Sequence, residues 1–264
     1  NARMMTPAWT PDGEYIIVKR QPAGPGANRG GGGLWMLHRD GGQGVQILDD
    51  NSAHWPSVSS DGRYVYYHVR TGSDALAGDY QIRRLELKNG EVTAVTAGRS
   101  QGAAAGRGSS GGAFAPEISP DGRWLAFARQ LPDATVSFKG RRFGPRTALW
   151  LRDLETGAER ILLDPVEIAH ESGSKSLRVL PGYSWTADGR AVVISQGGRV
   201  KRVDVATGNV ETIPFEAHVE RTISGMAYRG FRIDDGPFTA RFLRWHTASP
   251  DARRLAFQAI GRIW

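Results

Sequence analysis

Apolar and polar residues follow one phrase that recurs five times along the chain. Each copy has an apolar residue, a short polar turn centred on Asp and then a run of apolar residues. The copies are PAWTPDGEYIIV from Pro7, PSVSSDGRYVYY from Pro56, PEISPDGRWLAF from Pro116, GYSWTADGRAVVI from Gly182 and HTASPDARRLAF from His246. Self-similarity of this kind is the signature of a repeat architecture. We therefore expect one structural unit to be repeated along the chain.

Each phrase predicts two strands joined by a tight turn. An apolar triplet follows the Asp by four to six residues, as Leu125-Ala126-Phe127 follows Asp121. Short continuous apolar runs favour strands that are buried on both faces. Between the strands, Pro presets φ, Asp can bond the nearby backbone and Gly accommodates the exit of the turn. In the fifth copy Ala252 replaces this Gly, so we expect a somewhat different turn there.

Two further strands complete each repeat. The third strands are expected at 34–37, 82–87, 149–154 and 200–205, and the fourth at 45–48, 92–96, 158–163 and 209–213. Four antiparallel strands make a β-propeller blade. The prediction is an all-β propeller in one domain over 1–264, with blades that start near residues 7, 56, 116, 182 and 246. The fifth blade stops within its third strand, so about four and a half blades form an incomplete ring, and we expect an internal piece of a longer protein.

The longest connections are expected on one face of this propeller. They lie between second and third strands or between one blade and the next, and these two kinds of connection emerge on the same side of an antiparallel blade. The ranges are 21–33, 71–79, 130–147, 97–115, 164–181 and 214–243. Insertions on one face of a repeat protein often mark its binding face. We call it the long-loop face and expect binding there.

Composition narrows the classes of partner. The chain has 264 residues, a formal net charge of +7 and no Cys. The absence of Cys excludes disulfides, thiolate metal sites and Cys nucleophiles. The cations are scattered and no nucleic-acid motif occurs, so we do not expect nucleic acid as a partner. No apolar run approaches the ~20 residues of a membrane span.

No catalytic constellation is found in the sequence. There is no G-x-S-x-G elbow and no H-x-H or H-E-x-x-H pair, so no catalytic residue, metal ligand or cofactor is predicted in this segment. His170 and His218 fall in long connections with carboxylates nearby, where a ligand or acid–base role competes with a structural one. With Arg141, Arg142 and Arg221, they are the candidate binding residues, chosen by their placement on the long-loop face.

The repeats also carry a resemblance to known proteins. PAWTPDGEYIIV and PEISPDGRWLAF resemble the propeller repeats of TolB and related periplasmic proteins. The closing third, GYSWTADGRAVVISQGGRVKRVDVATGNVETIPFEAHVER followed by DDGPFTARFLRWHTASPDARRLAFQAIGRIW, resembles the N-terminal propeller region of bacterial amidohydrolase-related proteins. That resemblance implies a bacterial protein that is periplasmic or otherwise exported, with a metal-dependent hydrolase domain downstream, where a divalent metal such as zinc would bind. No family catalytic residue has a counterpart here.

Three functions follow from these observations. The first is a non-catalytic module of an amidohydrolase-like protein, which gates substrate or docks the downstream domain or another envelope protein through its long-loop face. The second is the propeller of a prolyl-oligopeptidase-like serine peptidase. The third is a stand-alone TolB-like envelope interaction protein. An H-x-H motif downstream would favour the first function and a G-x-S-x-G motif the second.

Overall fold

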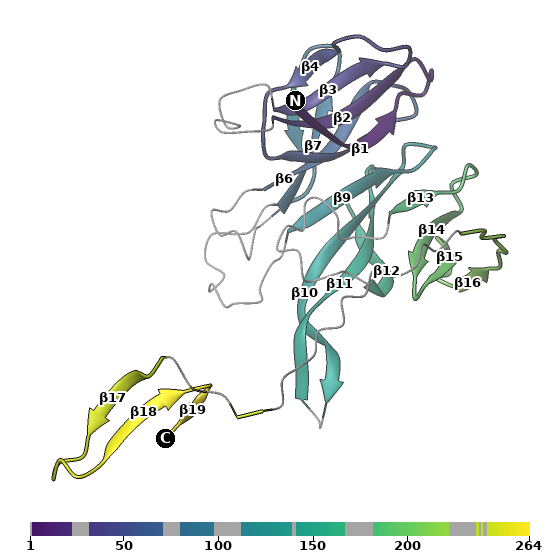
Figure 1. Ribbon diagram of the computed structural model, residues 1–264. Coiled ribbons are helices and arrows are strands. Elements are labelled where there is room, and N and C mark those ends of the chain that lie inside the picture. The colour runs from purple at the N-terminus through teal and green to yellow at the C-terminus, as the bar shows by residue number, and fades with distance from the viewer. Residues whose placement is uncertain are drawn as a thin grey trace. The chain divides into compact units, whose positions relative to one another are not determined.

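The described part of the chain consists of β-strands and their connections (Figure 1). The computed structural model describes residues 2–22, 32–70, 80–97, 112–138, 141–166, 182–221, 236–237, 239 and 242–264, with the backbone alone over 130–146. Two compact units divide the chain, Asn1–Glu216 and Ala217–Trp264. Among the described residues there is no helix, and hence none that could span a membrane.

The N-terminal unit contains four sheets of four antiparallel strands, and each sheet keeps its strands in chain order. We call these sheets blades 1 to 4. Blade 1 has β1 (Ala2–Trp9), β2 (Tyr15–Pro22), β3 (Gly33–His38) and β4 (Val45–Leu48); blade 2 has β5 (Ala53–Val58), β6 (Tyr64–Arg70), β7 (Tyr80–Glu86) and β8 (Val92–Ala94); blade 3 has β9 (Ala113–Ile118), β10 (Trp124–Phe138), β11 (Arg141–Asp153) and β12 (Glu159–Val166); blade 4 has β13 (Tyr183–Trp185), β14 (Ala191–Gln196), β15 (Arg199–Asp204) and β16 (Val210–Ile213).

The C-terminal unit contains one sheet of three antiparallel strands, blade 5. Its strands are β17 (Arg244–Ala248), β18 (Leu255–Ala259) and β19 (Arg262–Ile263). In the N-terminal unit the first strands link the blades, since β5 contacts both β1 and β9, and β9 contacts β13. Four-stranded antiparallel sheets that pack in succession through their first strands are propeller blades. The predicted all-β, incomplete propeller is therefore confirmed; the single domain over 1–264 stays a prediction.

The apolar core lies between the blades. Three buried clusters fill the junctions between blades 1 and 2, 2 and 3, and 3 and 4. In the middle blades the whole triplet after the Asp is buried, as Leu125, Ala126 and Phe127 are at 0 % exposure. In the N-terminal unit the double-sided burial predicted for these triplets thus comes from the neighbouring blades.

The Asp turns repeat one set of hydrogen bonds. In blade 3 the Ser119 hydroxyl donates to Oδ1 of Asp121 at 2.5 Å and accepts from the backbone N–H of Trp124 at 2.8 Å. The backbone N–H of Arg123 also donates to Oδ1 of Asp121, at 3.0 Å. Equivalent bonds to the Asp recur in every copy; their residue sets are Thr10/Asp12/Glu14, Ser59/Asp61/Arg63, Thr186/Asp188/Arg190 and Ser249/Asp251/Arg253. A hydroxyl residue two positions before the Asp is therefore part of the turn.

The fifth turn keeps the geometry of the others. Ala252 has a φ of 54°, close to the 73° of Gly122 in blade 3. Its backbone N–H donates to the carbonyl of Ser249 at 2.8 Å, as the N–H of Gly122 donates to that of Ser119 at 2.9 Å. The expectation of a different turn is wrong, because the repeated hydrogen bonds hold Ala252 in the left-handed region that favours glycine.

A β-bulge interrupts the first strand of four blades. Thr6, Trp55, Ala115 and Trp245 lie six residues before their Asp and have φ values of 49°, 55°, 52° and 51°. Next to each one the pairing with the second strand shifts register. A bulge bends its strand and re-aims the neighbouring side chains. In blade 2 this turn of the backbone directs the Trp55 indole toward blade 3, where it is hydrogen-bonded.

One of the expected long connections is a hairpin. The range 130–147 was predicted as an insertion between the second and third strands of blade 3, but β10 and β11 pair through it from Trp124–Asp153 to Phe138–Arg141. Pairing continues past a register shift at Leu131–Ala134. The segment alternates apolar and polar residues, so it extends the ladder. The remaining long connections expected on that face fall largely outside the described residues.

Candidate functional site

The described polar interior is centred on Glu117, in the first strand of blade 3. Its carboxylate accepts hydrogen bonds from the Trp55 indole Nε1 at 3.2 Å and from the Ser57 hydroxyl at 3.1 Å, both from blade 2. The Ser57 hydroxyl also accepts from the backbone N–H of Ile118 at 3.1 Å. The Glu117 carboxylate is therefore bound by two donors of the neighbouring blade.

No cation neutralises this carboxylate among the residues that the structure describes. Burial raises the pKa of Glu117 to about 7, and the hydrogen bonds from Ser57 and Trp55 oppose this rise without cancelling it. Removal of a carboxylate from water disfavours its charged form, whereas donors favour it. Glu117 consequently changes charge near neutral pH, at the junction of two blades.

Blade 4 contacts the same strand from the other side. The Trp185 indole Nε1 donates to the backbone carbonyl of Glu117 at 3.0 Å. The Tyr183 hydroxyl donates to the backbone carbonyl of Ala115, and burial followed by the nearby Glu117 charge raises the pKa of Tyr183 well above its ordinary value. Strand β9 is thus hydrogen-bonded to side chains from the blades on both sides.

Two stacked histidines extend the polar interior of blade 2. His54 and His68 have ring centroids 5.8 Å apart and an interplanar angle of 26°. His68 is 0 % exposed, and its Nδ1 accepts a hydrogen bond from the backbone N–H of Ala115 at 3.1 Å. Burial lowers the pKa of His54 to about 4 and that of His68 well below its ordinary value. Both rings are therefore neutral at physiological pH and act as packed side chains.

Lys19 is a buried cation between blades 1 and 2. The side chain is 1 % exposed, and Nζ donates to the backbone carbonyl of Asn51 at 2.6 Å. Burial lowers the pKa of Lys19 to about 8, although the Asp50 carboxylate opposes the shift. Lys19 therefore loses its proton more readily than an ordinary lysine. The hydrogen bond from its Nζ to Asn51 joins blade 1 to the connection that leads into blade 2.

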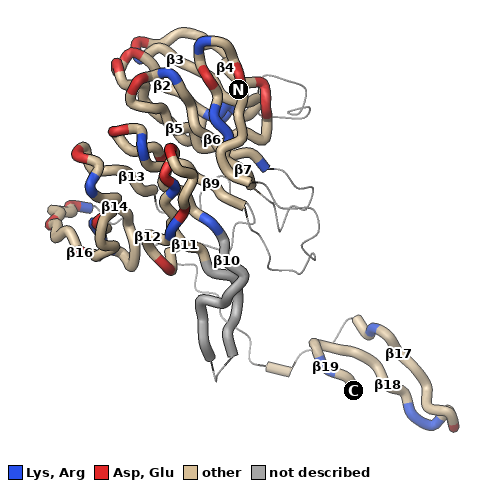
Figure 2. Tube along the Cα trace, turned by 180° about the vertical axis from the view of Figure 1, so that it is seen from behind, with Lys and Arg blue, Asp and Glu red and all other residues tan. Residues whose placement is uncertain are grey.

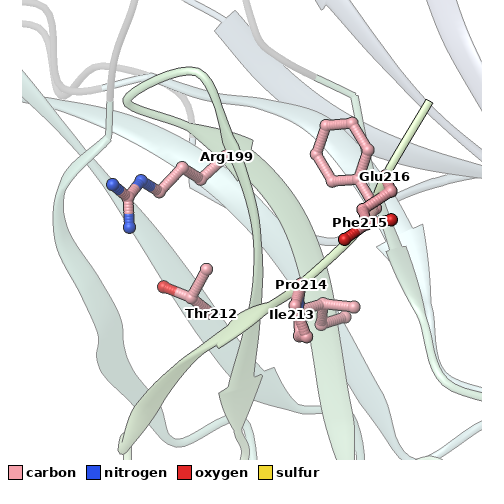
Figure 3. A pocket seen from close by; sticks show the side chains of 6 residues that line it. All are labelled: Arg199, Thr212, Ile213, Pro214, Phe215 and Glu216. Atoms are coloured by element: carbon pink, nitrogen blue, oxygen red, sulfur yellow. The ribbon is translucent and has the colours of Figure 1, made fainter. Parts of the chain in front are cut away.

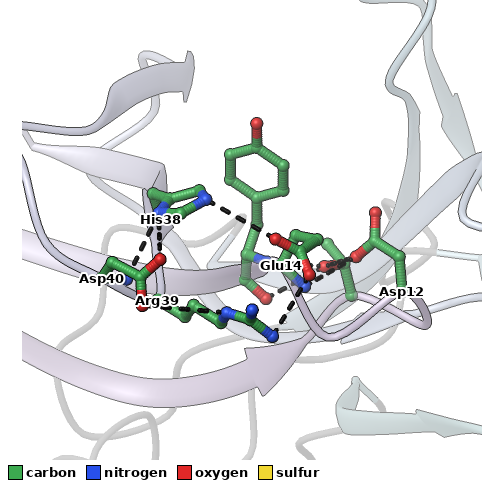
Figure 4. A network of polar contacts seen from close by, with 7 residues as sticks. Asp12, Glu14, His38, Arg39 and Asp40 are labelled. Carbon is green, nitrogen blue, oxygen red and sulfur yellow. Dashed lines mark hydrogen bonds and ion pairs between the residues drawn. The ribbon is translucent and has the colours of Figure 1, made fainter.

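A charged network lies on the surface of blade 1 (Figure 4). Glu14 forms an ion pair with Nη1 of Arg39 at 3.2 Å and lies 3.7 Å from Nε2 of His38. Asp40 lies 3.7 Å from Nδ1 of His38, and these groups are substantially exposed. In blades 2 and 3 the polarity of the corresponding pair is reversed, since Arg63 faces Glu86 and Arg123 faces Asp153. The exposed pairs of blade 1 contribute about 0–1 kcal/mol, so they orient the turn more than they stabilise it.

Two hollows open on the N-terminal unit. The first, ≈ 430 Å³, lies at the outer edge of blade 4 between Arg199, Thr212 and the segment Ile213–Glu216 (Figure 3). The second, ≈ 520 Å³, lies between the Asp turns of blades 2 and 3 and is lined by Asp61, Tyr64, Tyr66, Arg84, Asp121, Arg123 and Glu155 among others. The second hollow has two well-packed blades as its walls.

Four of the five candidate residues predicted from placement lie among the described residues. Arg141 and Arg142 begin β11, and they pair with Phe138 and Ser137 of β10 at the tip of the long hairpin of blade 3. His218 and Arg221 lie in the C-terminal unit and are exposed. His170 lies outside the described residues. The binding roles of all five stay predictions.

Sequence reasoning did not single out Glu117, Trp55, Ser57 or His68. A usable signal existed, because Trp55 precedes Pro56 at the bulge position and Glu117 is an ionisable residue inside an otherwise apolar first strand. In the part of the chain that is described, no three His, Asp or Glu side chains gather as a metal site. The one hydroxyl that bonds to Glu117 among the described residues, that of Ser57, is 4 % exposed and also accepts from the backbone N–H of Ile118, so the arrangement holds blades 2 and 3 together.

Comparisons with known proteins give resemblance at the level of architecture. No protein-family profile and no curated protein sequence matches the chain. A solved structure assigned as TolB from Agrobacterium tumefaciens shares 19% identity over 80% of this chain and 80% of that chain, with a TM-score of 0.46. The acylaminoacyl peptidase of Pyrococcus horikoshii shares 16% identity over 82% of this chain, with a TM-score of 0.47, and the β-propeller domain of the Trilobed protease of Pyrococcus furiosus shares 13% over 80%, with a TM-score of 0.45.

The lengths of these proteins differ greatly. This chain spans 33% of the acylaminoacyl peptidase and 57% of the Trilobed protease propeller. The resemblances are to proteins that contain β-propellers, and they transfer neither a substrate nor a catalytic residue to this chain.

Proposed function

We propose that this chain is a non-catalytic propeller module of a larger exported, amidohydrolase-like protein. In this proposal the module gates substrate or docks the hydrolase domain, or another envelope protein, through the long-loop face. The hydrolase domain would carry the catalytic residues and a divalent metal such as zinc. The localisation proposed is the periplasm, in agreement with the TolB-like repeats.

One structural observation carries the non-catalytic part of the proposal. Three strongly shifted ionisable groups of the described interior serve contacts beyond their own blade: Lys19 bonds to Asn51, His68 to Ala115, and Glu117 to Trp55 and Ser57. Perturbed pKa values also occur at catalytic sites, but there a cleft gives substrate access to the group. Here Lys19 and His68 are at most 1 % exposed and Glu117 is only partly exposed, so we interpret their burial as part of a scaffold.

The topology supports the choice of binding face. First-to-second and third-to-fourth strand connections are short at one end of each blade, as in residues 119–123 and 154–158 of blade 3. The residues between β2 and β3, β6 and β7, and β8 and β9 leave from the opposite end. Short turns at one end of the blades and long connections at the other favour recognition at the end with the long connections.

The parent open reading frame decides between the proposal and its alternatives. Continuation into a domain with an H-x-H motif supports it, continuation into a G-x-S-x-G domain favours the serine peptidase, and a stop soon after the last blade favours the stand-alone interaction protein. If a hydrolase follows, the zinc-loaded full-length protein should hydrolyse small amides equally well with and without His218→Ala and Arg221→Ala. The two changes should alter KM for large substrates only. Equal KM values for large substrates would overturn the gating role.

A further inference from the structure

The turn between β7 and β8 of blade 2 contains the only Asn-Gly pair of the chain, Asn89-Gly90. Asn loses its side-chain amide most readily before Gly, because Gly has no side chain to keep its backbone nitrogen away from the Asn carbonyl carbon. Both residues are exposed. Charged residues of both signs lie along the turns of the N-terminal unit (Figure 2), and Lys88 and Glu91 bring both signs to this one. Solvent therefore reaches the atoms that would react.

Deamidation joins two atoms that are neighbours in the chain. The backbone nitrogen of Gly90 attacks Cγ of Asn89, a C–N bond forms, and Nδ2 leaves as ammonia with the proton that the attacking nitrogen loses. Water then opens the cyclic imide at either of its two carbonyls, which gives Asp or isoaspartate at this position. The overall change consumes one water and releases one ammonia. The attacking nitrogen and the side-chain amide must both be free to approach each other before the first bond can form.

The folded turn engages both of these groups. The backbone N–H of Gly90 donates to the backbone carbonyl of Glu86 at 2.9 Å. Oδ1 of Asn89 accepts from the backbone N–H of Glu91 at 2.9 Å, and its Nδ2 donates to Oε2 of Glu86 at 3.0 Å. Attack by the nitrogen therefore requires the turn to open first. Glu86 takes part twice, through its backbone carbonyl and through its carboxylate.

Blade 3 builds the same turn with Thr in place of Asn. There the N–H of Gly157 donates to the backbone carbonyl of Asp153 at 2.8 Å. The Thr156 hydroxyl accepts from the backbone N–H of Ala158 at 3.3 Å, and Thr207 of blade 4 has the same role. A Thr side chain supports the turn and has no amide to lose. The chain thus supplies its own matched control for the Asn of blade 2.

We propose that Asn89 is a deamidation site that the closed turn protects, with the Glu86 carboxylate as the protecting group, and that deamidation separates β8 from β7. Asp at position 89 places a second carboxylate where Nδ2 now donates to Glu86, and isoaspartate lengthens the backbone of the turn by one carbon. The three residues of β8 are all exposed, so this strand depends on its pairing with β7. The product turn is therefore weaker than the original one.

Peptide mapping by mass spectrometry measures deamidation of Asn89 in the whole 264-residue chain, folded and in urea, at pH 8. We expect the folded chain to react at least about tenfold more slowly than the unfolded one, since the bonds of the turn must open first. Glu86→Ala should speed the reaction of the folded chain about fivefold. Glu91→Ala also removes a nearby carboxylate but keeps the backbone N–H that bonds to Asn89, so it should leave the rate unchanged.

In urea the two variants and the unchanged chain should react alike, because no turn is left to protect the amide. Three outcomes overturn the proposal: equal rates in the folded and unfolded chain, equal folded rates for Glu86→Ala and Glu91→Ala, or a faster reaction of Glu86→Ala that persists in urea. The amide spectrum of each variant verifies that it is folded.

The deamidated chain carries one more negative charge, so ion exchange separates it from the unreacted chain. The Glu86 amide donates to the backbone carbonyl of Glu91 at 2.8 Å and reports the pairing of the turn. Its hydrogen exchange should be about fivefold faster in the deamidated chain than in Asn89→Thr, which has no amide there. The Leu87 amide, bonded to the carbonyl of Arg63 at 2.9 Å, should exchange alike in both. Equal exchange of the Glu86 amide in the two proteins, or faster exchange of both amides after deamidation, contradicts the separation of β8.

Discussion

The indole nitrogen of Trp55 lies 3.2 Å from Oε1 of Glu117, although the two residues stand 62 positions apart in the chain. A bulge in blade 2 supplies the donor and the first strand of blade 3 supplies the acceptor. The contact places a titratable group at the junction of two blades. It therefore couples the packing of the propeller to pH.

Trp55→Phe should destabilise the N-terminal unit by about 1–3 kcal/mol, because it keeps an aromatic ring but leaves a buried carboxylate with one donor fewer. The loss should be larger at pH 8 than at pH 5, since the ionised carboxylate needs the donor more. Urea unfolding at both pH values measures it. In the Glu117→Gln background the pH dependence of the Trp55→Phe effect should vanish; if it persists, the carboxylate is not the partner that matters.

Glu117→Gln should stabilise the protein at pH 8 by about 2 kcal/mol and have little effect near pH 4.5. The pKa of Glu117 is raised from an ordinary 4.5 to about 7, so its contribution to stability is fully present below pH 4.5 and is lost as pH rises through 7. The glutamine side chain of the variant carries no charge, so the variant does not lose stability in this way as pH rises. Free energies of unfolding measured from pH 4.5 to 8 test the prediction, and parallel curves for the two proteins would contradict it.

Acid should destabilise the protein through His54 and His68, in the opposite sense to Glu117. The pKa of His54 falls from an ordinary 6.5 to about 4 on folding, so its stability contribution is present above pH 6.5 and is lost as pH falls through 4. His54→Gln should therefore reduce the decline in unfolding free energy between pH 6.5 and 4. The comparison is made in the Glu117→Gln background to remove the opposing titration. An unchanged decline would mean that the ring is solvated in the folded state.

Ala252→Gly should slow the opening of the fifth Asp turn by about fivefold, because glycine removes about 1 kcal/mol of left-handed strain. Hydrogen exchange of the Ser249 and Arg254 amides reports this opening, since both take part in the turn. Gly122→Ala in blade 3 is the matched reverse change. A Cβ there meets nothing within 4 Å, so backbone strain alone should speed exchange. Exchange unaffected by either change would show that the turn tolerates both residues equally.

The sequence by itself determined the repeated unit. The spacing of Asp121 from its flanking apolar residues predicts a turn between two strands, and the same local bonds form in every copy, even where Ala252 replaces Gly. Those bonds are local, since they join residues at most five positions apart, and so the pattern contains them. The pattern does not predict the hairpin over 130–147, because the length of a connection does not distinguish a loop from an extended ladder.

Only the tertiary structure determines which residues meet in the interior between the blades. Glu117 meets Trp55 and Trp185 across 62 and 68 positions, and the second hollow joins Arg84 of one blade to Glu155 of the next. Such pairings depend on how the blades twist and on where a bulge turns one side chain, and no short pattern records either. The pKa of Glu117 likewise follows from desolvation by neighbouring blades, so the same glutamate in an isolated strand would keep its ordinary value.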